Sequence, residues 1–272
     1  ALVNIDAGSG VIDMAATIAK CKSVAALPEV AYADVNRYNR SASTTPNDTY
    51  YSSQWHYGMI NLPQAWDITT GSNSVIVAVL DTGIVTAHAD LSSRLVSGYD
   101  FVSDASISCD GTGIDNNPED VADSRCVSGA IRPSDPRHSG YHGTHVSGTI
   151  GAATNNGAGV SGVTWAGKIM PIRVLGAGGG TDYDIIQGMM YAARLANDSG
   201  TLPAQKANII NMSLGGTPGE SCGAAVNAAF DAVYNAGVTV FVAAGNEESP
   251  NAINPTALCD HAIAVAAVNR YG

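Results

Sequence analysis

The sequence predicts an α/β fold in which a mostly parallel sheet is covered by helices on both faces, preceded by a small α+β unit. From residue 54 onward, short apolar runs alternate with stretches of helical length. Runs that are apolar at every position are typical of parallel strands buried on both faces, and the stretches between them supply the crossover helices. Residues 1–38 instead show one strand–helix–strand pattern. We therefore assign residues 1–42 to the first unit and 43–272 to the second.

The expected elements follow one another along the chain. In the first unit we expect strands over 1–6 and 30–38 and an amphipathic helix over 11–27. The polar, proline-containing stretch 39–51 has no periodicity and is the predicted linker. In the second unit we expect strands over 75–80, 168–175, 207–214, 238–245 and 261–268, and helices after His142 and over 183–196 and 222–236. Ligands bind beyond the carboxyl ends of parallel strands, so the residues that follow these runs are the candidate site.

Composition excludes several classes of partner. The net charge of −11, with a pI near 4.7, argues against nucleic acid and against an anionic membrane surface. No apolar run approaches the ~18 residues that a membrane span needs. The excess of carboxylates suits a hard cation such as calcium. The chain opens within a strand-like run, so we expect its N-terminus to lie upstream.

The five cysteines show no metal-ligand spacing. Cys109 and Cys126 bracket a polar loop, and Cys222 and Cys259 flank a helix–strand unit, so we expect disulfides Cys109–Cys126 and Cys222–Cys259. Cys21 is then left over. Paired cysteines fit an oxidising, extracellular or periplasmic compartment. Buried free thiols are the alternative, because one sequence does not reveal the pairing.

Three polar residues lie where the parallel-sheet rule places a site. Asp81 ends a wholly apolar strand, where a carboxylate costs free energy unless it is paired; a helix N-cap is the alternative. His142 precedes a helix and is followed by glycine. It could also be a surface histidine, or one of a metal pair with His145, although no third ligand has zinc spacing. Asn246 follows a strand, where it caps a turn or donates to a developing oxyanion.

Together these residues resemble the signature blocks of the subtilisin-like serine proteases, the subtilase family. The matching segments are 81–84 (DTGI), 142–149 (HGTHVSGT) and 243–247 (AAGNE). The resemblance covers nearly the whole chain and is closest to secreted enzymes of Gram-negative bacteria. It implies a secreted serine endopeptidase that acts on protein and peptide substrates, with export through the periplasm as one route. His142 would be the general base, Asp81 would orient its imidazole, and Asn246 would donate to the oxyanion.

The fourth block of that family, Gly-Thr-Ser-Met-Ala, is absent from the 272 residues. Ser213 ends a strand but resembles a substrate-binding residue, so the Ser nucleophile is not in the chain. We expect a precursor or cleaved fragment that is inactive by itself and has a C-terminal fragment bearing the serine as a partner. The alternative is a catalytically inactive peptide-binding module on the same fold.

The resemblance also implies two edges that pair with an extended peptide, and a specificity pocket between them. Nothing in these segments imposes charge, so we expect a broad preference for apolar side chains. Flexible turn glycines are the alternative for the run GAGGG at 176–180. The predicted substrate-binding residues are Gly178, Gly179, Gly180, Thr181, Ser213, Leu214, Gly215, Ala243, Ala244 and Gly245.

A glycine-rich loop follows the expected helix after His142. Residues 157–162 match the dinucleotide pattern GxGxxG, but a helix precedes them and a strand follows, which disfavours a nucleotide-binding α/β protein. The resemblance instead makes 154–160 (TNNGAGV) a loop that binds Ca²⁺. Residues 110–123 are a weaker candidate, for which a solvated acidic loop is an equal explanation. The implied calcium ligands are Gln54, Asp90, Thr154, Asn156, Ala158 and Val160.

The first unit resembles the end of the family's propeptide, with VAYADVN (30–36) in the place of its last conserved segment. Such a domain assists folding, covers the cleft and occupies the substrate site until it is cleaved. We therefore expect the chain's own propeptide as a partner, with cleavage within residues 39–45.

Overall fold

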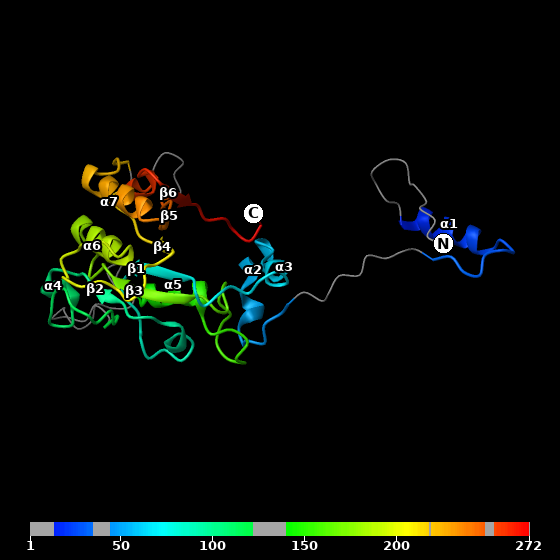
Figure 1. Ribbon diagram of the computed structural model, residues 1–272, viewed down its shortest axis with the longest axis horizontal. Coiled ribbons are helices and arrows are strands. Elements are labelled where there is room, and N and C mark those ends of the chain that lie inside the picture. Colours follow the sequence, from blue (N-terminus) through cyan, green and yellow to red (C-terminus); the bar gives the residue numbers. More distant parts are fainter. Residues whose placement is uncertain (1–13, 35–43, 122–139, 218, 248–252, 272) are drawn as a thin grey trace. The chain divides into compact units, whose positions relative to one another are not determined.

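The computed structural model describes residues 14–34, 44–121, 140–217, 219–247 and 253–271 (Figure 1). The chain divides into two units, 1–43 and 44–272, one residue from the predicted boundary. In the first unit, helix α1 (Met14–Ala25) lies within the predicted range 11–27. The strand predicted over 1–6 lies outside the described residues. Over residues 30–34 the strand prediction is wrong: no strand forms there, and Tyr32 is largely exposed, since a strand needs a paired neighbour.

A six-stranded sheet with the order β2-β3-β1-β4-β5-β6 forms the centre of the second unit, and every pairing in it is parallel. Five strands match predicted runs. The strand β2 was missed, because two residues are too short to produce a periodic pattern. The strands are β1 (Ile76–Asp81), β2 (Tyr99–Asp100), β3 (Lys168–Arg173), β4 (Ile209–Met212), β5 (Thr239–Ala243) and β6 (Ala262–Val265).

Three longer helices cover the sheet on both faces, as predicted. They are α5 (His142–Gly151), α6 (Asp182–Ala192) and α7 (Ala224–Asn235). Alternate residues of β1 show the two layers. Leu80 belongs to the core cluster that contains Met189 of α6 and Phe230 of α7, whereas Val79 belongs to a second cluster against which Val146 of α5 packs. Because successive strand residues point to opposite faces, this alternation requires a helical layer on each side.

Short elements complete the second unit, and sequence periodicity did not predict them because each is about one helical turn. They are η1 (Tyr51–Ser53), α2 (Trp55–Met59), α3 (Leu62–Trp66), η2 (Ser92–Arg94), α4 (Ala105–Ser108) and η4 (Pro255–Leu258). Of the helices in the described ranges, none is long and apolar enough to cross a membrane.

The predicted linker 39–51 is wrong in its second half. The hydroxyl and the N–H of Thr44 both donate to Asp67 Oδ1 at 2.8 Å, and Tyr50 N–H donates to the Gly159 carbonyl at 2.9 Å. A polar segment without periodicity can be ordered when distant parts of the chain supply its hydrogen-bond partners. Residues 44–51 therefore belong to the second unit.

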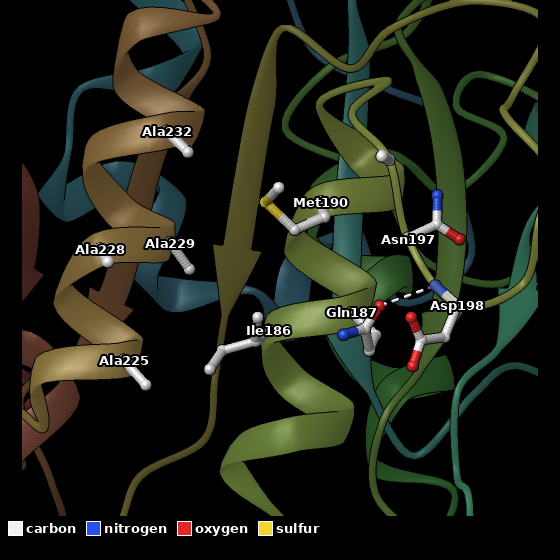
Figure 2. A pocket seen from close by; sticks show the side chains of 10 residues that line it. Ile186, Gln187, Met190, Asn197, Asp198, Ala225, Ala228, Ala229 and Ala232 are labelled. Carbon is white, nitrogen blue, oxygen red and sulfur yellow. Dashed lines mark hydrogen bonds between the residues drawn. The ribbon is translucent and has the colours of Figure 1, made fainter.

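Helices α6 and α7 leave an open hollow of about 420 Å³ between them. Figure 2 shows four alanines of α7 facing Ile186 and Met190 of α6 across it, with Gln187 accepting a hydrogen bond from the Asp198 N–H at 2.8 Å. Because alanine side chains are short, they do not fill the space between the two helices. The alanines are Ala225, Ala228, Ala229 and Ala232.

The disulfide Cys222–Cys259 is present, with a sequence separation of 37 residues. It joins the segment before α7 to the segment before β6. Cys109 is also disulfide-bonded, but the predicted Cys109–Cys126 pairing lies outside the described residues because Cys126 does. Cys21 is a free, buried cysteine in α1.

Removing the Cys222–Cys259 crosslink is expected to destabilise the second unit. In the chain-entropy picture, a closed loop of 37 residues contributes about 4 kcal/mol, which corresponds to a melting temperature lower by roughly 10 °C for a domain of this size. Thermal unfolding of the Cys222→Ala and Cys222→Ala/Cys259→Ala variants measures this. Both should lose stability equally, since either breaks the same bond; a loss of less than about 2 °C would contradict the prediction.

Candidate active site

The carboxyl end of β1 and the start of α5 bring Asp81 and His142 together. Nδ1 of His142 lies 2.8 Å from Asp81 Oδ1 and 3.0 Å from Oδ2. The N–H of Thr82 donates to Asp81 Oδ1 at 2.7 Å, which fixes the carboxylate. Asp81 is completely buried, whereas the His142 side chain is 49% exposed. One side of the imidazole is therefore held by the protein while the ring stays accessible to a ligand.

The hydrogen bond to Asp81 raises the pKa of His142 above that of an ordinary imidazole. Partial burial opposes this rise, and the negative charges of Asp81 and Asp120 add to it. An imidazole held by a carboxylate in this way can accept a proton from a neighbouring hydroxyl and hold it as a stabilised imidazolium.

Glycine is required where these two elements meet. A Cβ added to Gly143 would lie 2.2 Å from the Gly83 carbonyl oxygen, and Gly83 itself has a φ of +95°. The glycines that follow Asp81 and His142 in sequence therefore let the strand end and the helix start approach closely.

Asn246 follows β5 and is exposed; its own N–H donates to Glu247 Oε2 at 2.8 Å. Gly245 precedes it with a φ of 122°. In the strand order, β5 is separated from β1 by β4 only, and all three are parallel. Asn246 thus lies along the same sheet edge as the Asp81–His142 pair. Within the described part of the chain, it makes no hydrogen bond to either residue of that pair.

The run 176–180 forms a defined turn. Gly176 and Gly179 each donate to the other's carbonyl, at 2.8 and 3.1 Å, and Gly178 and Gly179 have φ values of 86° and 127°. Ala177 N–H donates to the Ile107 carbonyl at 2.8 Å. Thr181 then caps α6 by accepting from Asp184 N–H. These contacts explain the glycines structurally and leave the turn at the edge beyond β3.

Asn254, which sequence reasoning missed, joins the two walls of the predicted specificity pocket. It is 2% exposed. Its Nδ2 donates to the carbonyls of Leu214 and Ala243 at 2.8 and 2.9 Å, and its Oδ1 accepts from Gly216 N–H at 3.2 Å. A cavity of about 140 Å³ lies between β4 and β5 and is lined by Asn211, Ser213, Phe241, Val242, Ala243 and Val265. The Asn-Pro pair in the sequence indicates only a turn, so nothing there could have revealed this role.

The loop 154–160 lies between α5 and β3, confirming the helix-then-strand context of the GxGxxG match. Three of the predicted calcium ligands meet there. Asp90, which is 6% exposed, accepts from Asn156 Nδ2 at 2.8 Å and from Val160 N–H at 3.1 Å. The amide of Gln54 instead makes two hydrogen bonds with the backbone of Ser161, at 2.8 and 2.9 Å. Its oxygen therefore already has a partner outside the loop.

A second buried carboxylate, Asp48, approaches the same loop and was missed. It is 5% exposed, and Oδ2 accepts from Asn155 N–H at 2.8 Å, while the buried Oδ1 has no hydrogen-bond partner. Among the described residues, neither Asp48 nor Asp90 forms an ion pair. Two buried carboxylates without a cationic partner are costly, so these residues fit a bound cation. The signal was hidden because Asp48 lies in the segment predicted to be a linker.

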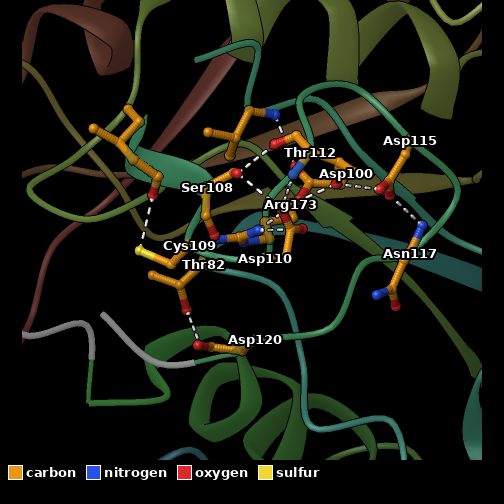
Figure 3. A network of polar contacts seen from close by, with 12 residues as sticks. Thr82, Asp100, Ser108, Cys109, Asp110, Thr112, Asp115, Asn117, Asp120 and Arg173 are labelled. Atoms are coloured by element: carbon orange, nitrogen blue, oxygen red, sulfur yellow. Dashed lines mark hydrogen bonds and ion pairs between the residues drawn. The ribbon is translucent and has the colours of Figure 1, made fainter. Parts of the chain in front are cut away.

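The acidic segment 110–123 has a different arrangement (Figure 3). Asp100, Asp110 and Asp115 come close enough together to hold an ion. However, the buried guanidinium of Arg173 already lies 2.6 Å from Asp100 and 3.3 Å from Asp110, and it also donates to the Ser108 carbonyl. Burial raises the pKa of Asp100, and Arg173 opposes that rise. Arg173 thus pairs with two of these three carboxylates, and we assign no metal there.

The fold and the edge of the sheet together define a class: a parallel α/β protein with a carboxylate–imidazole pair at its ligand edge. The chain belongs to the subtilase family, whose sequence profile matches residues 72–272.

Similar proteins include two from Gram-negative bacteria. The extracellular protease of Xanthomonas campestris pv. campestris is 41% identical over 269 residues, which cover 96% of this chain and 45% of that protein. The extracellular basic protease of Dichelobacter nodosus is 38% identical, with 92% of this chain and 42% of that protein covered. The chain thus spans about half the length of these relatives.

Among solved structures, a protease from Pseudoalteromonas arctica superposes with a TM-score of 0.75 at 40% identity, covering 84% of this chain and 67% of that one. This likeness confirms the predicted α/β class.

Proposed function

We propose that the protein is a secreted serine endopeptidase in which His142 is the general base, Asp81 orients it and Asn246 donates to the oxyanion. The hydrogen bond of 2.8 Å between His142 Nδ1 and the buried Asp81 carboxylate carries this proposal. It leaves the rest of the imidazole accessible at the edge where parallel sheets bind ligands. The extracellular names of the two bacterial relatives support secretion.

In the proposed reaction, His142 takes the proton from a serine hydroxyl as the oxygen attacks the peptide carbonyl. It then gives this proton to the leaving amine. Asp81 holds Nδ1 protonated, so that the other ring nitrogen is the one that accepts. Asn246 stabilises the negative oxygen of the tetrahedral intermediate. The serine would come from residues outside the 272, since no Gly-Thr-Ser block occurs among them.

The substrate would pair with the edges at 178–181 and 213–215, with its side chain in the cavity next to Ser213 and Ala243. The walls of this cavity are largely apolar, which favours apolar substrate side chains. We further propose that residues 1–43 are the end of a propeptide, because they form a separate unit. Mass spectrometry of the mature N-terminus would test the expected cleavage within 39–45.

Calcium would bind at the loop 154–160 and crosslink it to two distant segments. The side chains of Asp48, Asp90 and Asn156 and the carbonyls of Thr154, Ala158 and Val160 would hold it, with Gln54 outside this set. A bound divalent cation would neutralise both buried carboxylates. The unpartnered Oδ1 of Asp48 is the observation that supports this assignment.

Labelling with a fluorophosphonate probe tests the proposed activity. The full-length protein should be labelled on one serine and should hydrolyse an unfolded protein substrate. The His142→Ala variant should retain its fold but lose both labelling and hydrolysis. A folded full-length protein that is never labelled would contradict the proposal and favour an inactive peptide-binding module.

A further inference from the structure

The first turn of α5 carries His142, and yet the helix has no cap of its own. The residue before it, Tyr141, has a φ of 58° and makes no side-chain capping hydrogen bond. A helix that begins without a cap leaves its first N–H groups unsatisfied and its first turn free to fray. The position of His142 therefore depends on contacts from outside the helix.

The hydroxyl of Thr82 supplies the missing acceptor. Gly143 N–H, the second in the helix, donates to Thr82 Oγ1 at 3.0 Å. In return, Thr144 Oγ1 accepts from Val85 N–H at 2.9 Å. The segment after β1 and the first turn of α5 are thus joined by two hydrogen bonds in opposite directions, next to Asp81 and His142 in the sequence.

A third residue fixes the direction of the Thr82 hydroxyl. Thr82 Oγ1 donates to Asp120 Oδ2 at 2.7 Å, as the dashed line in Figure 3 shows. Both residues are buried, at 7% and 5% exposure. Because the hydroxyl proton is committed to Asp120, the oxygen presents a lone pair to Gly143 N–H. A carboxylate accepts this bond more strongly than a neutral group would.

The backbone around Asp120 is held as firmly as its side chain. Asp120 N–H donates to the Ile84 carbonyl at 2.9 Å, and Ile84 N–H donates to the Pro118 carbonyl at 3.0 Å. Glu119, between them, turns the other way and accepts from the hydroxyl and the N–H of Thr86. Adjacent acidic residues thus contact different partners, and the side-chain bond of Asp120 is the one that leads, through Thr82, to the helix that carries His142.

We propose that Asp120 is a positioning residue for the catalytic histidine, acting through Thr82 to cap the first turn of α5. This inference rests on the proposed peptidase function. The bond chain Asp120–Thr82–Gly143 holds the helix start in place while Asp81 holds the imidazole. Asp120 also adds a second buried negative charge near His142.

Among the described residues, two carboxylates act on the His142 imidazole. Asp81, at the end of β1, contacts the imidazole directly. Asp120, in the segment that follows the disulfide-bonded Cys109, interacts with it through its negative charge. Arg173, beside Asp81 in the strand register, directs its guanidinium to Asp100 and Asp110 instead. His145, on the same helix, donates its backbone N–H to the Tyr141 carbonyl. Removing the charge of Asp120 should therefore lower the pKa of His142, because less negative charge stabilises the imidazolium.

The full-length protein with substitutions at Asp120 and Thr82 tests the inference. Asp120→Ala and Thr82→Val should each lower kcat by about tenfold with little change in KM, since small displacements of a catalytic group are costly. The double variant should be no worse than either single one, because both remove the same bond chain. Asp120→Asn, which keeps an acceptor for the hydroxyl, should recover most of the lost kcat.

Glu119→Ala and Glu119→Gln are the matched controls. An NMR titration of the His142 imidazole should show a lower pKa in Asp120→Asn than in Glu119→Gln, and the acid limb of the kcat/KM profile should move with it. The inference would be overturned if Asp120→Ala and Glu119→Ala had equal kcat values and the pKa of His142 were also equal in Asp120→Asn and Glu119→Gln. Additive losses of kcat in the double variant of Asp120 and Thr82 would overturn it as well. If the unaltered protein hydrolyses no peptide, the proposed function fails, and the titration still decides the role of Asp120.

Discussion

Asp81→Asn in the full-length protein is expected to lower kcat by about 10⁴-fold, as the corresponding change does in other enzymes with this triad. The amide of asparagine can lie at the same distance of 2.8 Å from His142 Nδ1. Unlike the carboxylate, however, it can donate an N–H to this nitrogen. It would then hold the imidazole in the tautomer that cannot accept a proton from serine. The substitution also removes the charge that stabilises the imidazolium. Since this charge acts on the catalytic step, kcat should fall strongly while KM changes little.

Glu220→Gln is a matched control for this variant, because it also removes one carboxylate charge, at an exposed position in the described chain. It should leave kcat unchanged. Hydrolysis of a peptide substrate, with circular dichroism to verify the fold, measures both variants. If Asp81→Asn retained more than about a tenth of the activity, the carboxylate would not have the orienting role we propose.

The raised pKa of His142 gives activity and stability opposite pH dependences. Activity needs the neutral imidazole, so it should fall as the pH drops through a value above the ordinary ~6.5. The favourable pairing with Asp81 contributes to stability below the unfolded-state pKa and is lost as the pH rises through the folded-state pKa. A kcat/KM profile with its acid limb at or below 6.5 would contradict this.

Chelation of calcium is also expected to destabilise the protein. At free calcium 100 times the dissociation constant, binding contributes about 2.7 kcal/mol. Its removal should therefore lower the melting temperature by roughly 5–10 °C. The structural reason is that the ion would connect the loop 154–160 to Asp48, 107 residues from its partner Asn155, and to Asp90.

Asp48→Asn makes this test specific. With calcium present, the variant should melt lower than the unaltered protein, because it loses a ligand. In the presence of a chelator, the difference in melting temperature between the two proteins should disappear or change sign. The reason is that the variant no longer buries a carboxylate oxygen without a partner. Glu220→Gln should behave like the unaltered protein in both conditions. A Gln54→Ala variant with the same calcium-dependent loss as Asp48→Asn would instead support the ligand set expected from sequence.

Much of the fold could be predicted because its signals are local. A strand buried on both faces consists mainly of apolar residues, which made β1 predictable, and its polar last residue, Asp81, was then conspicuous. The elements that escaped prediction were too short for periodicity, as β2 and α4 are, or had partners elsewhere, as in the segment 44–51. The strand predicted over 30–38 does not form in its described part, 30–34, for the converse reason: a strand-like composition does not supply a neighbouring strand.

The sequence by itself determined the family resemblance, the parallel α/β class and the order of Asp81, His142 and Asn246 at strand and helix ends. Tertiary structure alone decided which polar residues serve that edge. Asp120 reaches Thr82 across 38 residues, Asn254 reaches Leu214 across 40, and Asp48 reaches its loop across 107. Each is buried, and a buried polar group must find a hydrogen-bond partner wherever the folded chain brings one. No local pattern can specify partners so distant along the sequence.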